Sequence, residues 1–218
     1  MFKVSFTPHN GESNNFLGYC NLVADDKYRM TSISVLKSDT SENGFFLSMP
    51  AYYTGRKDEN DKPVFKDYFY PLDSDFRHEL NEAVKKAMEL GEPVEFCRDE
   101  SVSFNVKVKP KEYPNDNASK ASVTVYLSRG LPDKKADMVI DSYHIREVLS
   151  GEKAGKLFIA APSKKNSKGD YNDICYPTTK EFRDELFGSI MKSYESVISK
   201  EPGTMKISDA DASDVVTK

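Results

Sequence analysis

Apolar positions in this chain follow two different periods, and the change from one to the other happens twice. Before Pro71, apolar residues alternate with polar ones or form short runs, a pattern that predicts β-strands. After Pro71 the apolar spacing lengthens to about 3.6 residues, the period of an amphipathic helix. The same change recurs after Pro177. Each half of the chain is therefore expected to form several strands followed by one helix.

In the first half, strands are expected where apolar runs end at turn residues or at prolines. The expected strands span residues 4–6, 16–24, 28–36, 44–49 and 64–70. Asp25-Asp26 predicts a hairpin turn, because Asp tolerates turn geometry and bonds its own backbone. Residues 52–62 are polar and predict a long loop.

In the second half the same reasoning predicts strands at residues 102–108, 122–127, 138–148, 156–160 and 171–176, with a polar loop at 163–169. The first helix is expected to run to about residue 90, with Asp73 or Ser74 as its N-cap and Gly91 as its end. Its apolar face is predicted to consist of Phe76, Leu80, Ala83, Val84 and Ala87, and that of the second helix of Phe182, Leu186, Ile190 and Val197.

The two halves also share sequence motifs. Phe65-Lys66-Asp67, Tyr70-Pro71 and residues 76–80 reappear 106 positions later as Tyr171-Asn172-Asp173, Tyr176-Pro177 and residues 182–186. Ile33 and residues 46–50 match Ile145 and residues 158–162 with an offset of 112, so the six-residue difference falls in a polar loop. Length variation confined to a surface loop indicates duplication of a folded unit.

The duplication predicts an α+β fold of two repeats, each a small antiparallel β-sheet with one C-terminal helix. We expect the first repeat at residues 1–91, a linker at 92–101 and the second repeat at 102–200. Residues 201–218 are acidic and poor in large apolar side chains, and are expected to form a disordered tail.

Composition narrows the class of protein. The 218 residues include 31 basic and 35 acidic side chains, a net charge of -4, so any nucleic-acid binding must depend on a local patch. Three scattered cysteines without CxxC spacing argue against disulfides and structural zinc and favour a reducing compartment. The chain begins like a strand instead of a signal peptide and has no apolar run long enough to span a bilayer, so a cytoplasmic location is expected.

Catalytic motifs are not found. The three histidines, His9, His78 and His144, lie far apart, and no Ser, Cys or carboxylate motif accompanies them in both halves. We therefore expect a protein that is not an enzyme and that carries no cofactor and no metal.

The motifs resemble those of the SpoVG family, small bacterial proteins named for a stage V sporulation and septation phenotype. The resemblance lies in Asp25-Asp26, residues 33–36 and 44–50, and Phe65-Lys66-Asp67 before Pro71. In the second half it lies in Ile145, residues 157–165 and 169–174, and Tyr176-Pro177. Members of this family are similar in being homodimeric regulators that bind DNA or RNA. The resemblance implies that the two repeats pack as an intrachain pseudo-dimer that binds nucleic acid, with a further homo-oligomer possible and no membrane partner.

Both polar loops carry positive charge at the same point of the repeat. Lysines and arginines there could meet phosphates while tyrosines stack on bases, the usual chemistry of single-strand binding. The candidate residues are Arg56, Lys57, Lys164, Lys165, Lys168, Tyr52 and Tyr171, and Tyr53 and Tyr176 are further rings that could stack. Arg77, Lys85, Lys86, Arg183 and Lys192 on the helices could extend the patch, although salt bridges at the helix start are the simpler role for the two arginines.

The sequence also allows two other interpretations of these segments. The loops could be ordinary solvated hairpins, and the tyrosines could pack in strands. The acidic pI near 5.5 also fits a protein-interaction module or inhibitor that presents acidic surface and a strand edge to a protein partner.

Overall fold

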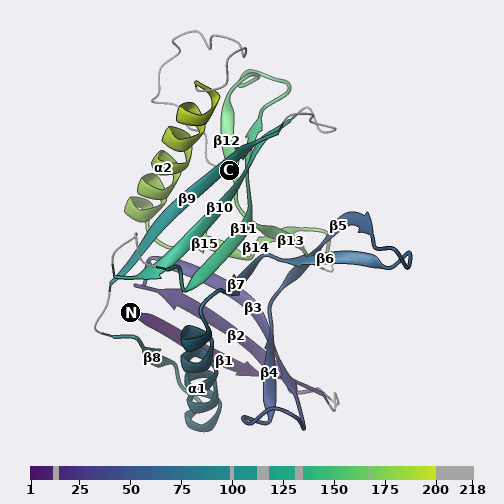
Figure 1. Ribbon diagram of the computed structural model, residues 1–218, viewed down its shortest axis with the longest axis vertical. Coiled ribbons are helices and arrows are strands. Elements are labelled where there is room, and N and C mark those ends of the chain that lie inside the picture. The colour runs from purple at the N-terminus through teal and green to yellow at the C-terminus, as the bar shows by residue number, and fades with distance from the viewer. Residues whose placement is uncertain (12–14, 99–100, 112–117, 131–134, 167, 200–218) are drawn as a thin grey trace.

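The computed structural model describes residues 1–11, 15–98, 101–111, 118–130, 135–166 and 168–199 (Figure 1). The fold is α+β, with mostly antiparallel sheets and a helix at the end of each repeat. The first sheet contains β1 (Phe2–Pro8), β2 (Phe16–Ala24), β3 (Tyr28–Lys37), β4 (Phe45–Ser48), β8 (Val94–Phe96) and β15 (Cys175–Pro177). The second sheet contains β7 (Phe69–Pro71), β9 (Val102–Pro110), β10 (Ser119–Arg129), β11 (Met138–Glu147) and β12 (Leu157–Ala160).

One short strand of each repeat pairs in the sheet of the other repeat. In the first sheet, β3 pairs with β2 along one edge and with both β4 and β15 along the other. In the second sheet, β11 pairs with β10 along one edge and with both β12 and β7 along the other. Thus β7 from the first repeat completes the second sheet, and β15 from the second repeat completes the first.

The exchange corrects the expectation of unbroken strands at 64–70 and 171–176. Each of these segments divides at one residue, Tyr68 or Ile174, into a hairpin strand and an exchanged strand. The amide of Tyr68 donates to Pro50 of its own repeat (2.9 Å), while its carbonyl accepts from the amide of Asp141 in the other repeat (2.7 Å). In the second repeat the amide of Ile174 donates to the carbonyl of Pro162 (2.7 Å), and its carbonyl accepts from the amide of Thr31 in the first repeat (2.9 Å). The backbone at this residue therefore turns from one sheet to the other.

The helices return to the sheets of their own repeats. Helix α1 (Ser74–Leu90) packs on β1 and β8, and α2 (Lys180–Ile198) packs on β9 (Figure 1). The Asp73 side chain caps α1 by accepting from the amides of residues 75 and 76, and Gly91 ends it at a φ of 70°, as predicted. The predicted apolar face of α1 is confirmed by its buried residues. On α2 the buried residues are Leu186, Ile190 and Tyr194. Val197 was expected as the last buried residue of this face, but Tyr194, about one turn closer to the start of the helix, has that role.

Turns and strand registers refine the repeat alignment. Asp25 and Asp26 have φ values of 48° and 53°, which fits the predicted tight hairpin turn. The expected match of Ile33 with Ile145 is wrong by two residues, and the counterpart of Ile145 is Val35. Val35 pairs with Leu47 in the first repeat, and Ile145 pairs with Ile159, the equivalent of Leu47, in the second. The connection that follows is longer in the second repeat, residues 148–156 against 38–44, and it absorbs the difference.

The segment expected to be a linker, residues 92–101, contains β8, which pairs with β1 at the edge of the first sheet. The predicted tail, residues 201–218, lies outside the described residues.

Both repeats contribute to one continuous hydrophobic core. At its centre the hydroxyl groups of Tyr28 and Tyr143, one from each repeat, form a hydrogen bond of 2.9 Å. Tyr143 also donates to the carbonyl of Cys175 (3.4 Å). Burial raises the pKa of both phenols, so both remain neutral donors across the physiological range.

The tyrosine pair gives a test of the contact between repeats. Tyr143→Phe leaves the Tyr28 hydroxyl buried without a partner among the described residues, and should lower the free energy of unfolding by about 1–3 kcal/mol. Tyr28→Phe should lower the free energy of unfolding by a smaller amount, because the Tyr143 hydroxyl keeps its hydrogen bond to the carbonyl of Cys175. The double variant should cost less than the sum, measured by urea unfolding with Tyr19→Phe as the exposed control. Additive losses would show that the two hydroxyls are not coupled.

Candidate nucleic-acid interface

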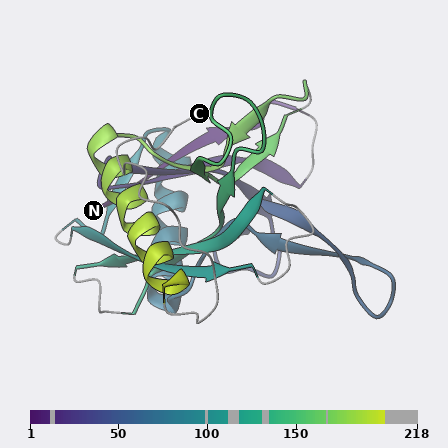
Figure 2. The same ribbon diagram turned by 90° about the horizontal axis from the view of Figure 1, so that it is seen from above.

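The two segments predicted as polar loops form β-hairpins, which was one of the alternatives that the sequence left open. The first hairpin consists of β5 (Ala51–Lys57) and β6 (Pro63–Asp67), and the second of β13 (Ser163–Lys165) and β14 (Tyr171–Asp173). Both lie on the side of the molecule away from α2, and the first projects far beyond the sheets (Figures 1 and 2). Each hairpin leads directly into an exchanged strand, so its base is fixed between the two sheets.

The two hairpin turns are built in the same way. The carboxylate of Asp58 accepts from the amides of residues 60 (2.8 Å) and 62 (2.9 Å). The side-chain oxygen of Asn166 accepts from the amides of residues 168 (2.9 Å) and 170 (3.0 Å). The six additional residues of the first repeat therefore lengthen the hairpin arms and leave the turn itself unchanged. Part of the difference is a bulge between Tyr53 and Lys57 of β5.

The predicted basic residues of the first hairpin differ in whether an acidic side chain of the hairpin pairs with them. Arg56 lies in the bulge of β5 and is exposed. Lys57 is held by Asp61, with its ammonium group 2.8 and 2.9 Å from the two carboxylate oxygens. Part of the predicted positive charge of this hairpin is thus neutralised within its own turn.

Tyr52 is half-buried, and its ring packs against Tyr68 with ring centres 5.0 Å apart. The next residue, Tyr53, points to the other side of the strand and is 49% exposed. It pairs across the hairpin with Phe65, which is 58% exposed, and the two ring centres are 5.9 Å apart. The aromatic surface of the first hairpin is therefore Tyr53 and Phe65.

The second hairpin presents the predicted residues. Lys164, Lys165 and Lys168 are exposed, and Tyr171 is 67% exposed. The ammonium group of Lys165 lies 5.2 Å from the centre of the Tyr171 ring, within range of a cation–π contact.

The exposed pairs of the two hairpins occupy the same position. Tyr53 and Phe65 pair across the first hairpin as Lys165 and Tyr171 pair across the second, with the offsets of 112 and 106 that relate the repeats. Sequence reasoning missed Phe65, and it named Tyr53 beside Tyr52 without separating the exposed ring from the packed one. The period-two alternation of a strand could have separated Tyr52 from Tyr53, had the segment been predicted as a strand.

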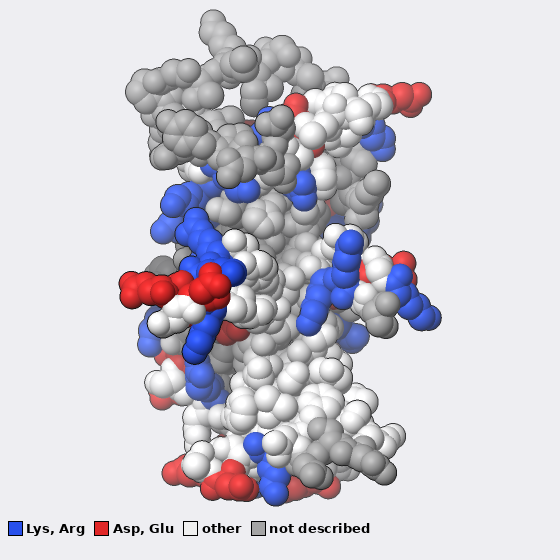
Figure 3. Space-filling model, turned by 90° about the vertical axis from the view of Figure 1, so that its right-hand side faces the viewer, with Lys and Arg blue, Asp and Glu red and all other residues white. Residues whose placement is uncertain are grey.

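Figure 3 faces the side from which the first hairpin projects. It shows two separate groups of Lys and Arg at mid-height, and the one on the left has the larger share of Asp and Glu beside it. This agrees with the acidic side chains of the first turn, Asp58, Glu59 and Asp61. The second hairpin is the more strongly basic of the two.

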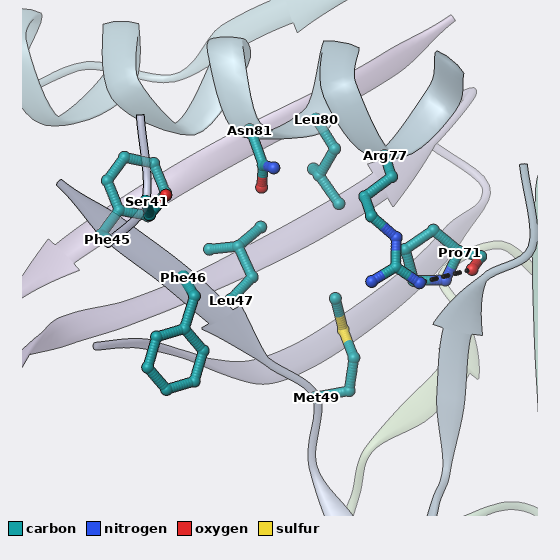
Figure 4. Close-up of a pocket in the computed structure, with 9 residues that line it drawn as sticks. All are labelled: Ser41, Phe45, Phe46, Leu47, Met49, Pro71, Arg77, Leu80 and Asn81. Atoms are coloured by element: carbon teal, nitrogen blue, oxygen red, sulfur yellow. Dashed lines mark hydrogen bonds between the residues drawn. The ribbon is translucent and has the colours of Figure 1, made fainter. Parts of the chain in front are cut away.

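The helix arginines engage their own surroundings. Arg77 donates to the carbonyl of Pro71 (3.2 Å) at one end of a cleft of about 230 Å³ between β4 and α1 (Figure 4). Arg183 lies 3.8 Å from the carboxylate of Asp184. Both arginines thus have local partners near the start of a helix. Lys85, Lys86 and Lys192 are exposed on the helices, which lie apart from both hairpins (Figure 1), so the structure gives no support to their extending the patch.

Two further observations concern other classes of protein. Among the described residues no cluster of His, Cys, Asp and Glu could hold a metal ion. Neither helix in the described part of the chain is long and apolar enough to cross a membrane.

Comparison with known proteins identifies the family. The SpoVG family model matches residues 1–89 and again residues 103–196, so the chain belongs to the SpoVG family and carries two copies of its unit. The septation protein SpoVG of Macrococcus caseolyticus is 38% identical over 66 residues, covering 30% of this chain and 56% of that protein. That of Lachnospira eligens is 44% identical over 52 residues, covering 24% and 57%.

A longer alignment is found with the septation protein SpoVG of Staphylococcus epidermidis, which is 29% identical over 107 residues, covering 49% of this chain and 93% of that protein. The chain thus spans little more than half of the first two relatives but nearly all of the third. No solved structure matches the chain significantly.

A carboxylate lies at the base of each hairpin. Asp67 and Asp173 occupy equivalent positions, and although both residues are exposed, the desolvation of their carboxyl groups by neighbouring atoms raises the pKa of both above the usual value of 3.8. The positive charge of Arg77 partly offsets this effect at Asp67. A raised pKa means that the folded state binds the proton more tightly than the unfolded state, so the charged carboxylate opposes folding at neutral pH.

Asp173→Asn should therefore raise the melting temperature at pH 7. The gain should shrink as the pH falls through the raised pKa toward 3.8, because the wild-type carboxyl group then becomes neutral too. Melting curves between pH 7 and about 3.5 measure this, and Asp170→Asn at the exposed turn is the control with the same change of charge. A gain that does not depend on pH would contradict the assignment.

Proposed function

We propose that this protein is a non-enzymatic regulator that binds nucleic acid through its two hairpins. The observation that carries the proposal is the repeated exposed pair, Tyr53 with Phe65 and Lys165 with Tyr171, beside free basic side chains. Large exposed aromatic side chains at the same position of two hairpins are poorly explained by packing, since neither pair is covered by the rest of the described chain.

The chemistry fits single-stranded nucleic acid best. An exposed aromatic ring can stack on any base, and each stacked base contributes about 1–3 kcal/mol. Lysine and arginine beside the ring can neutralise phosphates and release counterions. Lys164, Lys165 and Lys168 supply this charge on the second hairpin, and Arg56 on the first. Membership of a family whose members are named as septation proteins is consistent with a regulatory role.

We also propose that the two repeats form an intrachain pseudo-dimer, in which each repeat takes the place of one subunit. The reciprocal pairing of β7 with β11 and of β15 with β3 supports this, because the two contacts are related by the repeat itself. An approximate two-fold arrangement of this kind presents both hairpins on one side of the molecule (Figure 2).

The basic residues can be tested by the salt dependence of binding. Wild-type protein should shift single-stranded DNA or RNA in a gel assay at low salt, with duplex DNA and duplex RNA run alongside. Replacing Lys164, Lys165 and Lys168 together with Ala should reduce the slope of log K against log salt by up to about 2, since each lost phosphate contact contributes about 0.7.

The control replaces Lys85, Lys86 and Lys192 with Ala, which removes the same charge from exposed helix positions. An unchanged slope in the hairpin variant would reject the lysines as phosphate contacts. No shift with any of the four nucleic acids would reject nucleic-acid binding and leave a protein-interaction module as the remaining function.

The aromatic residues should affect affinity without affecting the salt slope. Phe65→Ala and Tyr171→Ala are each expected to weaken binding of a single strand by about 5- to 150-fold, because stacking carries no charge. Phe46→Ala, which removes an exposed aromatic ring from β4, is the control. Fluorescence anisotropy with a labelled oligonucleotide measures both quantities, and an affinity that survives both substitutions would contradict stacking at the hairpins.

A further inference from the structure

The second sheet has an outer face, turned away from α2, whose residues follow from the strand register. Ser122 on β10 pairs with Lys109 on β9 and with His144 on β11, so these three side chains point to the same side. Lys107 shares that side because it pairs with Thr124. The alternate residues of the same strands, such as Val108 and Val123, are buried in the core.

The outer face of the second sheet is basic. Lys107 and Lys109 are exposed and form no ion pair with any described residue. His144 is half-buried beside them, and burial lowers the pKa of its imidazole, with Lys111 and Arg146 lowering it further. The carboxylate in this region, Asp141, accepts a hydrogen bond from Thr124 (2.9 Å). The sheet therefore carries two uncompensated lysines close to a neutral imidazole.

The first sheet does not share this feature. The pair of Phe6 with Cys20 in the first sheet is equivalent to the pair of Val108 with Val123 in the second. The neighbours of Val108, which are Lys107 and Lys109, therefore correspond to the neighbours of Phe6, which are Ser5 and Thr7. Lys3, the lysine on this strand, is held by Asp26 (3.1 Å) and Glu95 (3.6 Å). In Figure 3 the lower third of the molecule shows few Lys and Arg side chains, whereas more of them lie above it.

Aromatic residues connect this face to the first hairpin. Tyr70 of β7 follows the hairpin and pairs with Val139, which pairs in turn with Tyr126 on β10. Tyr126 and Asp67 are both close enough to influence the pKa of Tyr70, which partial burial raises. The hairpins and the outer face lie on the same side of the molecule, opposite α2 (Figures 1 and 2).

We propose that a single strand of nucleic acid held at the hairpins continues across the outer face of the second sheet, with phosphates at Lys107 and Lys109 and bases against Tyr70 and Tyr126. The inference rests on the proposed function and extends the binding site from the hairpins to one sheet. Only a single strand fits this role, because bases reach aromatic side chains on an open sheet only when they are unpaired. The complete binding site is therefore asymmetric, although the hairpins are repeated.

Lysines on β9 also have a simpler explanation. In the described part of the second sheet β9 is the edge strand, and lysine on an edge strand discourages pairing with another chain. This explanation predicts self-association when the lysines are removed, whereas a binding role predicts weaker binding. The experiment must therefore measure both.

The test uses the full chain with Lys107 and Lys109 both replaced by Ala, and Lys85→Ala with Lys86→Ala as a control of equal charge. Anisotropy is measured with labelled oligothymidylates of about 5 and about 15 nucleotides, a range that small single-strand binding folds occupy. For the longer strand the variant should lose about 1.4 from the salt slope, two contacts at about 0.7 each. The shorter strand is chosen to engage the hairpins without reaching the sheet, and its binding should be affected much less. Circular dichroism checks folding, and light scattering checks association.

A second variant tests whether the first sheet is left out of the proposed binding site because it has no lysines at the positions equivalent to Lys107 and Lys109. Ser5→Lys with Thr7→Lys places two lysines at the equivalent positions of the first sheet and should steepen the salt slope for the longer strand.

The outcomes separate the two proposals. Wild-type binding of both strands that is unaffected by loss of Lys107 and Lys109 overturns the extended site and leaves the hairpin function intact. Self-association of that variant with normal binding also overturns it, in favour of edge protection. No wild-type binding of either strand removes the proposed function and this inference together.

Discussion

The exchange of β7 and β15 is the constraint on which the rest of the structure depends. Each sheet needs three residues from the other repeat to complete the edge of its central strand. A short three-residue strand has little stability of its own, so both exchanged strands are held by the sheets that they complete. The buried hydrogen bond between Tyr28 and Tyr143 joins the repeats at the same place, and one core runs through both. The two repeats therefore form one structural unit.

This constraint also places the hairpins. Each hairpin lies between a strand that belongs to its own sheet and a strand that belongs to the other, so its base is fixed on both sides. The turn residues Asp58 and Asn166 hold the tips in the same geometry. An insertion in one hairpin can therefore lengthen the arm and leave the exposed pair at its base in register. Tyr53 with Phe65 and Lys165 with Tyr171 keep equivalent positions for this reason.

Duplication within one chain permits a difference that two identical subunits cannot have. Ser5 and Thr7 in the first repeat correspond to Lys107 and Lys109 in the second, and Tyr53 corresponds to Lys165. The second repeat is the more basic one in its hairpin and on the outer face of its sheet. A net charge of -4 is compatible with such a surface, because the binding of a polyanion depends on local charge within about a Debye length.

The sequence by itself determined the duplication, the α+β class and the helix that ends each repeat. Helix α1 was predicted to its caps because the signals at Asp73 and Gly91 and the period of its apolar residues are all local. The sequence also located the two basic segments. Only the tertiary structure decided that they are hairpins, that Tyr53 and not Tyr52 is exposed, and that β7 and β15 change sheets. Tyr68 and Ile174 divide their strands through hydrogen bonds to distant residues, Asp141 and Thr31. Contacts between residues so far apart in the chain leave no periodic signal near the residues that make them.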